Sequence, residues 1–388
     1  FFVENLGKKK NFNFFTTFEF KLFLILYLYL VVNSFFSQEI IFSLKRTLPY
    51  FKFLIFLMFY KELIENKTIN LKIAFRFWLI IIIFLSLDII YQYSFGRDIF
   101  GYVTNYPSRN SGFFFDELVA GNFLLSLSFL TIIFFKDKIK NIYIIIFLTL
   151  IFCVTIMTGE KSNIIKFSII YFFTLFWLYE FKIKKIFPKF LFFIFFILPI
   201  FYFFNGKDLK DRFMYYLGEK EMSLKEKYFT TPYGAHTLNA YFVFKDNLFF
   251  GVGNKNFRYA CSNHDEKVLK YQAEIFSKYL EQYHHRDNKK ATFGDHSGCL
   301  SHPHQVYNEL LSEHGLIGTI IIFSIFFMII KNNLKNRKLS NLNIVAGIYL
   351  VVFFIPILPS GSIFTTLNSL FLWINALFFL TRFKIIYE

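Results

Sequence analysis

Long apolar runs separated by short polar connections occupy almost the whole chain. Several of these runs exceed the ~18 apolar residues that a helix needs to cross a bilayer. The pattern predicts an all-α polytopic transmembrane helix bundle of about ten spans. We place the spans at residues 22–36, 47–60, 75–93, 117–135, 141–157, 163–180, 186–204, 306–330, 342–358 and 363–380.

One long hydrophilic segment interrupts this pattern between the seventh and eighth predicted spans. It divides the chain into an N-terminal bundle (1–204), a large loop (205–304) and a C-terminal bundle (305–388). All eight histidines of the chain lie between His236 and His314, in or just after this loop. We therefore expect the chemistry of the protein to concentrate there.

Composition and charge agree with a membrane protein. The chain is 55% hydrophobic, with a mean hydropathy of +0.44 and a net charge of +16. Most Lys and Arg residues lie in short loops between spans, so the charge does not indicate nucleic-acid binding.

The distribution of these cations also predicts an orientation. Placing both chain ends in the cytoplasm puts most of the short-loop Lys and Arg on the cytoplasmic side, as the positive-inside rule requires. Four segments then share the outer side: the loop around Arg109, the turn at Glu160-Lys161, the large loop, and the turn Pro359–Ser362. A site built from several loops on one face would have this arrangement.

A His-Gln pair marks the boundary between the large loop and the eighth predicted span. His304 and Gln305 precede this helix, and the positive end of its dipole would keep the imidazole neutral and able to accept a hydroxyl proton. Gly315 and Gly318 would lie on one face of the helix, where a second helix or a lipid-linked substrate can approach closely. The alternative is a helix-packing pair with a solvated histidine at its mouth.

Three cations on the outer side suit an anionic headgroup. Arg109, Lys161 and Arg212 each fall close to a predicted span end. An Arg guanidinium matches phosphate oxygens, and a Lys supplies a point charge. The alternative for each is snorkelling at the interface or pairing with a nearby carboxylate.

The cysteines of the large loop allow two interpretations. Cys261 and Cys299 could form a disulfide if the loop is periplasmic. A zinc site built from His296, Cys299, His302 and His304, with Cys261 upstream, is the rival, but closely spaced Cys-x-x-Cys ligands are lacking, so we predict no metal. Gly251-Val252-Gly253 is a turn signal rather than a nucleotide-binding motif.

These motifs together resemble the O-antigen ligase/polymerase family. His304-Gln305, nine residues, then Gly315 and Gly318 is similar to the family's signature of His, then Asn, Ser or Gln, nine residues, Gly, two residues, and Gly, Thr or Tyr. Three further matches occur in the same order along the chain. These are Arg109–Gly112 with the segment around Glu117 and Gly121, Thr158–Ser162, and the turn Gly251–Gly253. One departure is Lys161, where the family usually has Arg, so a bidentate phosphate contact would become monodentate.

The resemblance implies a glycosyltransferase fold of the GT-C type in the bacterial inner membrane, with transfer at the periplasmic face. The donor would be a glycan on undecaprenyl diphosphate, and the acceptor another glycan or the lipid A core. No cofactor is implied, and a chain-length regulator would be a partner. On this basis we expect His304 to be the general base and Arg212 to be catalytic with it. Arg212, Lys161 and Arg109 would bind the diphosphate and stabilise it as the leaving group.

Two choices stay open. The segment around Glu117 and the turn Pro359–Ser362 favour a polymerase over a ligase. A transporter or flippase for lipid-linked sugars is a separate class. It is less favoured because no inverted repeat is visible and few ionisable residues lie inside the predicted spans.

Overall fold

The computed structural model describes most of the chain as helices. It covers residues 14–106, 109–180, 223–278, 298–335, 338–356, 358–364 and 366–383, with isolated positions at 182, 184, 188 and 195. No strand occurs among these residues. Arg212, both chain ends and the predicted seventh span apart from positions 188 and 195 lie outside them.

The first half of the chain forms seven helices within the described residues. They are α1 (Phe18–Ser34), α2 (Ile40–Thr47), α3 (Phe51–Glu65), α4 (Leu71–Phe95), α5 (Ala120–Phe134), α6 (Asn141–Met157) and α7 (Lys161–Leu178). Short 3-10 turns lie at Phe14–Thr16, Leu48–Tyr50, Gly112–Phe114 and Lys136–Lys138.

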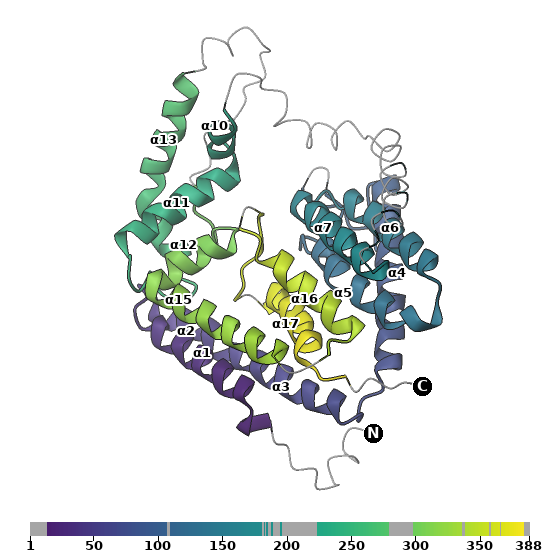
Figure 1. The fold of residues 1–388 in the computed structure, drawn as a ribbon. Helices are drawn as coiled ribbons and strands as arrows, with labels where there is room; N and C mark the ends of the chain where they lie inside the picture. The colour runs from purple at the N-terminus through teal and green to yellow at the C-terminus, as the bar shows by residue number, and fades with distance from the viewer. Residues whose placement is uncertain are drawn as a thin grey trace.

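The large loop contributes further helices, and the C-terminal part adds three in the portion that the structure describes. The loop forms α10 (Leu224–Phe229), α11 (Pro232–Asp246), α12 (Phe257–Ala260), a 3-10 turn (Cys261–His264) and α13 (Asp265–Ser277). The C-terminal helices are α15 (Val306–Leu334), α16 (Asn341–Phe353) and α17 (Thr366–Leu380). In Figure 1, α10, α11 and α13 gather beside one end of α15, and α16 and α17 lie between α15 and the α4–α7 group.

Each expected span that falls within the described residues corresponds to a helix, with ends shifted by a few residues. Two helices, Leu71–Phe95 and Val306–Leu334, are long and apolar enough to cross a membrane by length and composition. The helices Ala120–Phe134, Asn141–Met157 and Asn341–Phe353 and the segment Ser369–Leu380 are apolar but shorter. The number of crossings and the domain boundaries remain predictions.

Local capping defines where several helices begin. Thr17 accepts a hydrogen bond from Phe20 N at 3.3 Å at the start of α1. Asn70 caps α4 in the same way, and Ser340 forms a capping box with Asn343 at the start of α16. These side chains satisfy backbone N–H groups that have no partner inside the helix.

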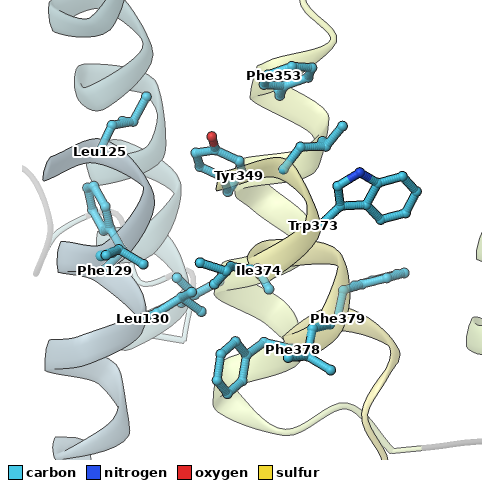
Figure 2. Packing of buried hydrophobic residues seen from close by; sticks show 14 of the residues in the cluster. Leu125, Phe129, Leu130, Tyr349, Phe353, Trp373, Ile374, Phe378 and Phe379 are labelled. Atoms are coloured by element: carbon cyan, nitrogen blue, oxygen red, sulfur yellow. The ribbon is translucent and has the colours of Figure 1, made fainter. Parts of the chain in front are cut away.

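A single apolar cluster joins the helices of both bundles. Leu130 on α5 lies next to Ile374 of α17, and Tyr349 of α16 points toward α5 (Figure 2). The ring of Phe129 packs instead on that of Phe167 of α7, with centroids 4.7 Å apart. Buried amides add cross-links within this core, since Asn375 of α17 donates to Ser126 Oγ of α5 at 2.8 Å. Polar contacts of this kind are common between helices packed in lipid.

Candidate active site

The turn Pro359–Ser362 is hydrogen bonded to other segments that the charge pattern predicts on the outer side. Ser360 N donates to the carbonyl oxygen of His304 at 2.8 Å. Ser162 Oγ and Lys166 Nζ donate to the carbonyl oxygen of Pro359 at 2.5 and 3.0 Å. The start of α7, the end of the large loop and this turn therefore meet at one place.

The loop around Arg109 joins the same place. Asn110 Nδ2 donates to Met157 O at 2.7 Å, and Asn110 N donates to Thr158 O at 3.4 Å. These bonds hold the loop against the turn that precedes Lys161. All four segments that the charge pattern assigned to one side are thus linked through hydrogen bonds.

His304 lies immediately before α15, and Gln305 is the N-cap of that helix. Gln305 Oε1 accepts from Asn308 N at 2.7 Å, while its Nε2 donates to Pro356 O. Asn and Ser cap helices by the same kind of bond, which explains why a His-Gln, His-Asn or His-Ser pair suits this position. His304 itself has φ +52°, a left-handed conformation that the following cap and the Ser360 bond hold in place.

Three histidines form a cluster that includes His304. The ring centroids of His302 and His236 lie 4.1 and 4.7 Å from that of His304, and the ring of Tyr233 lies at 6.5 Å. His236 comes from α11, far from His304 in sequence. No local spacing pattern links the two residues, so sequence reasoning missed His236; only the crowding of histidines in the loop pointed to it.

The surroundings of His304 keep it neutral. Burial, followed by the nearby His236 and Arg109, lowers the pKa of His304 to about 4. Burial and the neighbouring His304 and Lys255 likewise hold the pKa of His302 well below its usual range. The pKa is lowered in the expected direction, and the largest cause is burial.

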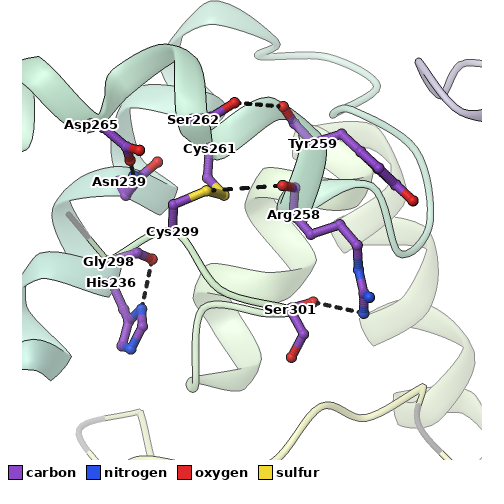
Figure 3. The surroundings of a disulfide bond; sticks show 10 residues. All are labelled: His236, Asn239, Arg258, Tyr259, Cys261, Ser262, Asp265, Gly298, Cys299 and Ser301. Carbon is purple, nitrogen blue, oxygen red and sulfur yellow. Dashed lines mark hydrogen bonds between the residues drawn. A yellow bond between two sulfur atoms is a disulfide. The ribbon is translucent and has the colours of Figure 1, made fainter. Parts of the chain in front are cut away.

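A disulfide fixes the segment that leads to this cluster. Cys261 and Cys299 are bonded, with a Cα–Cα distance of 5.1 Å. The adjacent Gly298 carbonyl accepts a hydrogen bond of 2.7 Å from His236 Nδ1 (Figure 3). The disulfide is therefore connected to the histidine cluster through Gly298.

A buried ion pair lies near the histidine cluster. Lys255 Nζ is 2.9 Å from Glu309 Oε1, and both side chains are almost fully buried. Ser362 Oγ hydrogen bonds with both groups, and Ile363 N donates to Glu309 Oε2 at 3.0 Å. This network connects the large loop, α15 and the turn Pro359–Ser362, and sequence reasoning did not identify Lys255 or Glu309.

The predicted glycines form a joint rather than a flat helix face, which corrects the sequence interpretation. Gly315 has φ +63° and ψ −167°, so α15 is broken there and Gly315 and Gly318 do not lie on one continuous helical face. A side chain at Gly318 would overlap the Tyr29 hydroxyl of α1, so α1 does approach closely at that position.

The turn Gly251–Gly253 completes this joint. The break leaves the carbonyls of Ser312 and Glu313 without their helical partners, and they accept from Val252 N and Gly253 N at 3.0 and 2.9 Å. In return, Leu316 N and Ile317 N donate to Leu248 O and Phe249 O at 2.8 and 3.1 Å. The two backbone segments come so close that a side chain at Gly251 would overlap the backbone of Glu313, and one at Gly315 would overlap the backbone of Phe249.

The remaining predicted residues divide into three groups. Arg109 is close enough to His304 to lower its pKa. Lys161 is the first residue of α7, and the next residue, Ser162, donates a hydrogen bond to Pro359 O in the Pro359–Ser362 turn. Glu117 is exposed on the surface. Arg212 lies outside the described residues. Within the described part of the chain, no group of three or more His, Cys, Asp or Glu residues has an arrangement that could hold a metal ion.

These features define an all-helical protein with apolar helices and a histidine-centred polar site where its loops meet. Residues 145–323 match the family model described as O-antigen ligase. Over this range the chain is similar to the O-antigen ligase/polymerase family, and the match supports a role of that type in surface polysaccharide assembly. The search of curated proteins and that of solved structures found no match.

The matched range includes the histidine cluster, the glycine joint, Lys161 and the Lys255–Glu309 pair. It leaves out Arg109, Glu117 and the turn Pro359–Ser362. The family match thus covers the centre of the site but not all of the segments that meet there.

Proposed function

We propose that this protein is an inner-membrane glycosyltransferase that polymerises O-antigen repeat units carried on undecaprenyl diphosphate, at the periplasmic face. The observation that carries the proposal is a neutral, half-buried His304, with Arg109 near enough to lower its pKa, at the place where the four linked segments meet. The family match supports the general class of reaction.

In the proposed reaction, His304 accepts the proton of the acceptor hydroxyl. The hydroxyl oxygen then attacks the anomeric carbon of the donor, and the bond from that carbon to the diphosphate oxygen breaks. The diphosphate leaves with the bonding electron pair. Arg109, Lys161 and Arg212 are proposed to bind it and to stabilise its developing charge, an electrostatic role that often dominates catalysis.

The exposed surface supports a location in a bilayer. On α4, Phe77, Ile80 and Leu87 are exposed, as are Ile320 and Phe327 on α15. Soluble proteins rarely expose contiguous apolar surface on this scale. We propose that lipid covers these faces, with the chain ends in the cytoplasm and the large loop in the periplasm.

The alternative is an O-antigen ligase that transfers the finished glycan to the lipid A core. A transporter for lipid-linked sugars is less favoured, because no inverted repeat is visible in the sequence and few ionisable residues lie inside the predicted spans. A chain-length regulator is a proposed partner only of the polymerase.

The glycolipids of cells lacking this protein distinguish the candidates. Single repeats on the lipid A core would support polymerisation. Long glycans left on undecaprenyl diphosphate, together with bare core, would support ligation. An unchanged profile would contradict both and favour the transporter.

The role of His304 is tested by complementing these cells with His304→Gln and with the control His264→Gln. His264 lies in the same loop but packs beside Phe242 and Asp246, away from the cluster. We expect His304→Gln to abolish transfer at normal protein levels and His264→Gln to preserve it. Transfer by His304→Gln at the normal rate would remove the general-base assignment.

A further inference from the structure

Helix α2 buries polar side chains and exposes apolar ones, which is the reverse of a helix on a water-exposed surface. Its hydroxyl residues Ser43 and Thr47 are completely buried and bond Asn254 at 2.6 and 2.7 Å. Its isoleucines point outward, and Ile41 is 70% exposed. A helix facing water would bury the isoleucines and expose the hydroxyls.

A turn of the large loop adds aromatic residues to this face. Phe249 is 63% exposed, and the ring of Phe250 stacks on that of Phe36 with centroids 5.0 Å apart. The Phe250 carbonyl also accepts from Asn33 Nδ2 at 3.1 Å, which ties the turn to the end of α1. We call this surface the aromatic patch; it consists of Phe35, Phe36, Ile40, Ile41, Phe249 and Phe250.

The aromatic patch continues directly onto the exposed apolar face of α15. The glycine joint bonds Ile317 N to Phe249 O, so Phe249 lies at the level of Leu316 and Ile317, which are themselves exposed. Further along the same helix, Ile320 is 63% exposed. Because α15 is long and apolar enough to cross a membrane, the patch is an extension of a candidate lipid-facing surface.

Basic residues border the aromatic patch. Lys45 and Arg46 are exposed in the last turn of α2. The guanidinium groups of Arg46 and Arg258 lie 5.3 and 4.9 Å from the ring centroid of Phe42. Apolar and aromatic side chains bordered by cations are typical of segments that lie at the boundary between lipid headgroups and acyl chains.

From these features we infer that the aromatic patch inserts into the outer leaflet of the bilayer and anchors the large loop to it. The phenyl and isoleucine side chains occupy the upper acyl region, while Lys45, Arg46 and Arg258 contact lipid phosphates. The inference rests on the proposed membrane location, and it places part of a predicted water-exposed loop in lipid.

Single cysteines carrying an environment-sensitive thiol dye test this inference in the full chain. The native background is low, because Cys153 is buried and Cys261 and Cys299 are bonded to each other. Phe249→Cys and Ile41→Cys report on the patch, and Ile320→Cys reports on the α15 face. Leu224→Cys, at a site 86% exposed on α10, is the control for water.

The labelled proteins are placed in nanodiscs of phosphatidylethanolamine and phosphatidylglycerol. Emission is quenched either by a nitroxide on the lipid acyl chain near the headgroup or by iodide in the water. We expect blue-shifted emission at positions 249 and 41 that the nitroxide suppresses and iodide does not. Position 224 should respond to iodide only.

Quenching of both patch positions by iodide, with Ile320→Cys quenched by the nitroxide, would overturn the anchor while leaving the membrane location intact. Protection of both positions from both quenchers would also overturn it and would indicate a protein occupant. Quenching of Ile320→Cys by iodide would overturn the membrane location itself.

Discussion

His304 is crowded by two histidines and an arginine, and this environment defines its chemistry. A neutral imidazole is ready to accept a proton, whereas an imidazolium is not. Because the pKa of His304 is lowered to about 4, the neutral form persists well below the pH of ~6.5 at which a solvent-exposed histidine would titrate.

The pH profile of glycan transfer should show this directly. We expect the rate in proteoliposomes to be independent of His304 titration down to about pH 5 and to fall as the pH approaches the lowered pKa of about 4. Arg109→Gln removes a cation that lowers this pKa, so the acid limb should move to higher pH whatever the residual rate. An acid limb near pH ~6.5 in the wild-type protein would contradict this environment for His304.

Gly315 has a backbone conformation that other residues rarely adopt. Its φ of +63° and ψ of −167° belong to a region that is essentially restricted to glycine, and other residues pay about 1–3 kcal/mol there. A methyl group would in addition overlap the backbone of Phe249.

Gly315→Ala should therefore destabilise the protein by more than its conformational cost alone. Gly96→Ala is the control for positive φ: Gly96 has φ +73° and ψ 1°, in the less costly left-handed helical region, and a methyl group there would have no neighbouring atom within 4 Å. Thermal unfolding in detergent should show a larger loss of midpoint temperature for Gly315→Ala. Equal losses would mean that the contact between α15 and the 249–250 turn contributes nothing.

At the scale of elements, the glycine joint and the Lys255–Glu309 pair attach the large loop to α15. The joint exchanges four backbone bonds, and the ion pair adds a contact to the turn Pro359–Ser362. Both sets of contacts join segments that are distant in sequence. They therefore hold the large loop, α15 and the Pro359–Ser362 turn together around His304.

Glu309→Gln tests this frame. Removing one charge of a buried pair leaves the other unpaired, at a cost of about 3–5 kcal/mol. The control Glu180→Gln breaks the Lys182–Glu180 pair, whose side chains are 56% and 78% exposed, and should cost less than about 1 kcal/mol. The measurement is thermal or denaturant unfolding in detergent, and similar losses for the two variants would contradict the importance of the buried pair.

The helices were largely predictable, and the joint was not. Apolar runs such as 141–157 correspond to helices because lipid or a packed core demands the same uninterrupted pattern. Gly315 looked like a helix-packing glycine because sequence spacing does not show that a distant turn supplies the missing hydrogen bonds. His236 and Glu309 were missed for the same reason, since only tertiary packing brings them to the site.

At the scale of the whole molecule, the four segments predicted on the outer side are linked to one another by hydrogen bonds. Glu117 and Lys138 lie beyond opposite ends of α5, and both are exposed. The proposed orientation therefore places Glu117 in the periplasm and Lys138 in the cytoplasm.

Cysteine labelling with a membrane-impermeant maleimide checks this arrangement. Glu117→Cys should react in intact spheroplasts, whereas Lys138→Cys should react only after the membrane is permeabilised. The wild-type protein measures the background from the native cysteines. Labelling of Lys138→Cys in intact spheroplasts would contradict the orientation.

The Cys261–Cys299 disulfide also has a consequence for how the proposed enzyme matures. Thiols stay reduced in the cytoplasm, so in the proposed orientation the bond closes only after the loop has reached the periplasm. Until then, the segment bearing Gly298, Ser301 and His304 is tethered only through its own hydrogen bonds and its connection to α15. A newly inserted chain is thus incomplete until the oxidising machinery of the envelope acts on it, which ties the output of surface glycan to the redox state of that compartment.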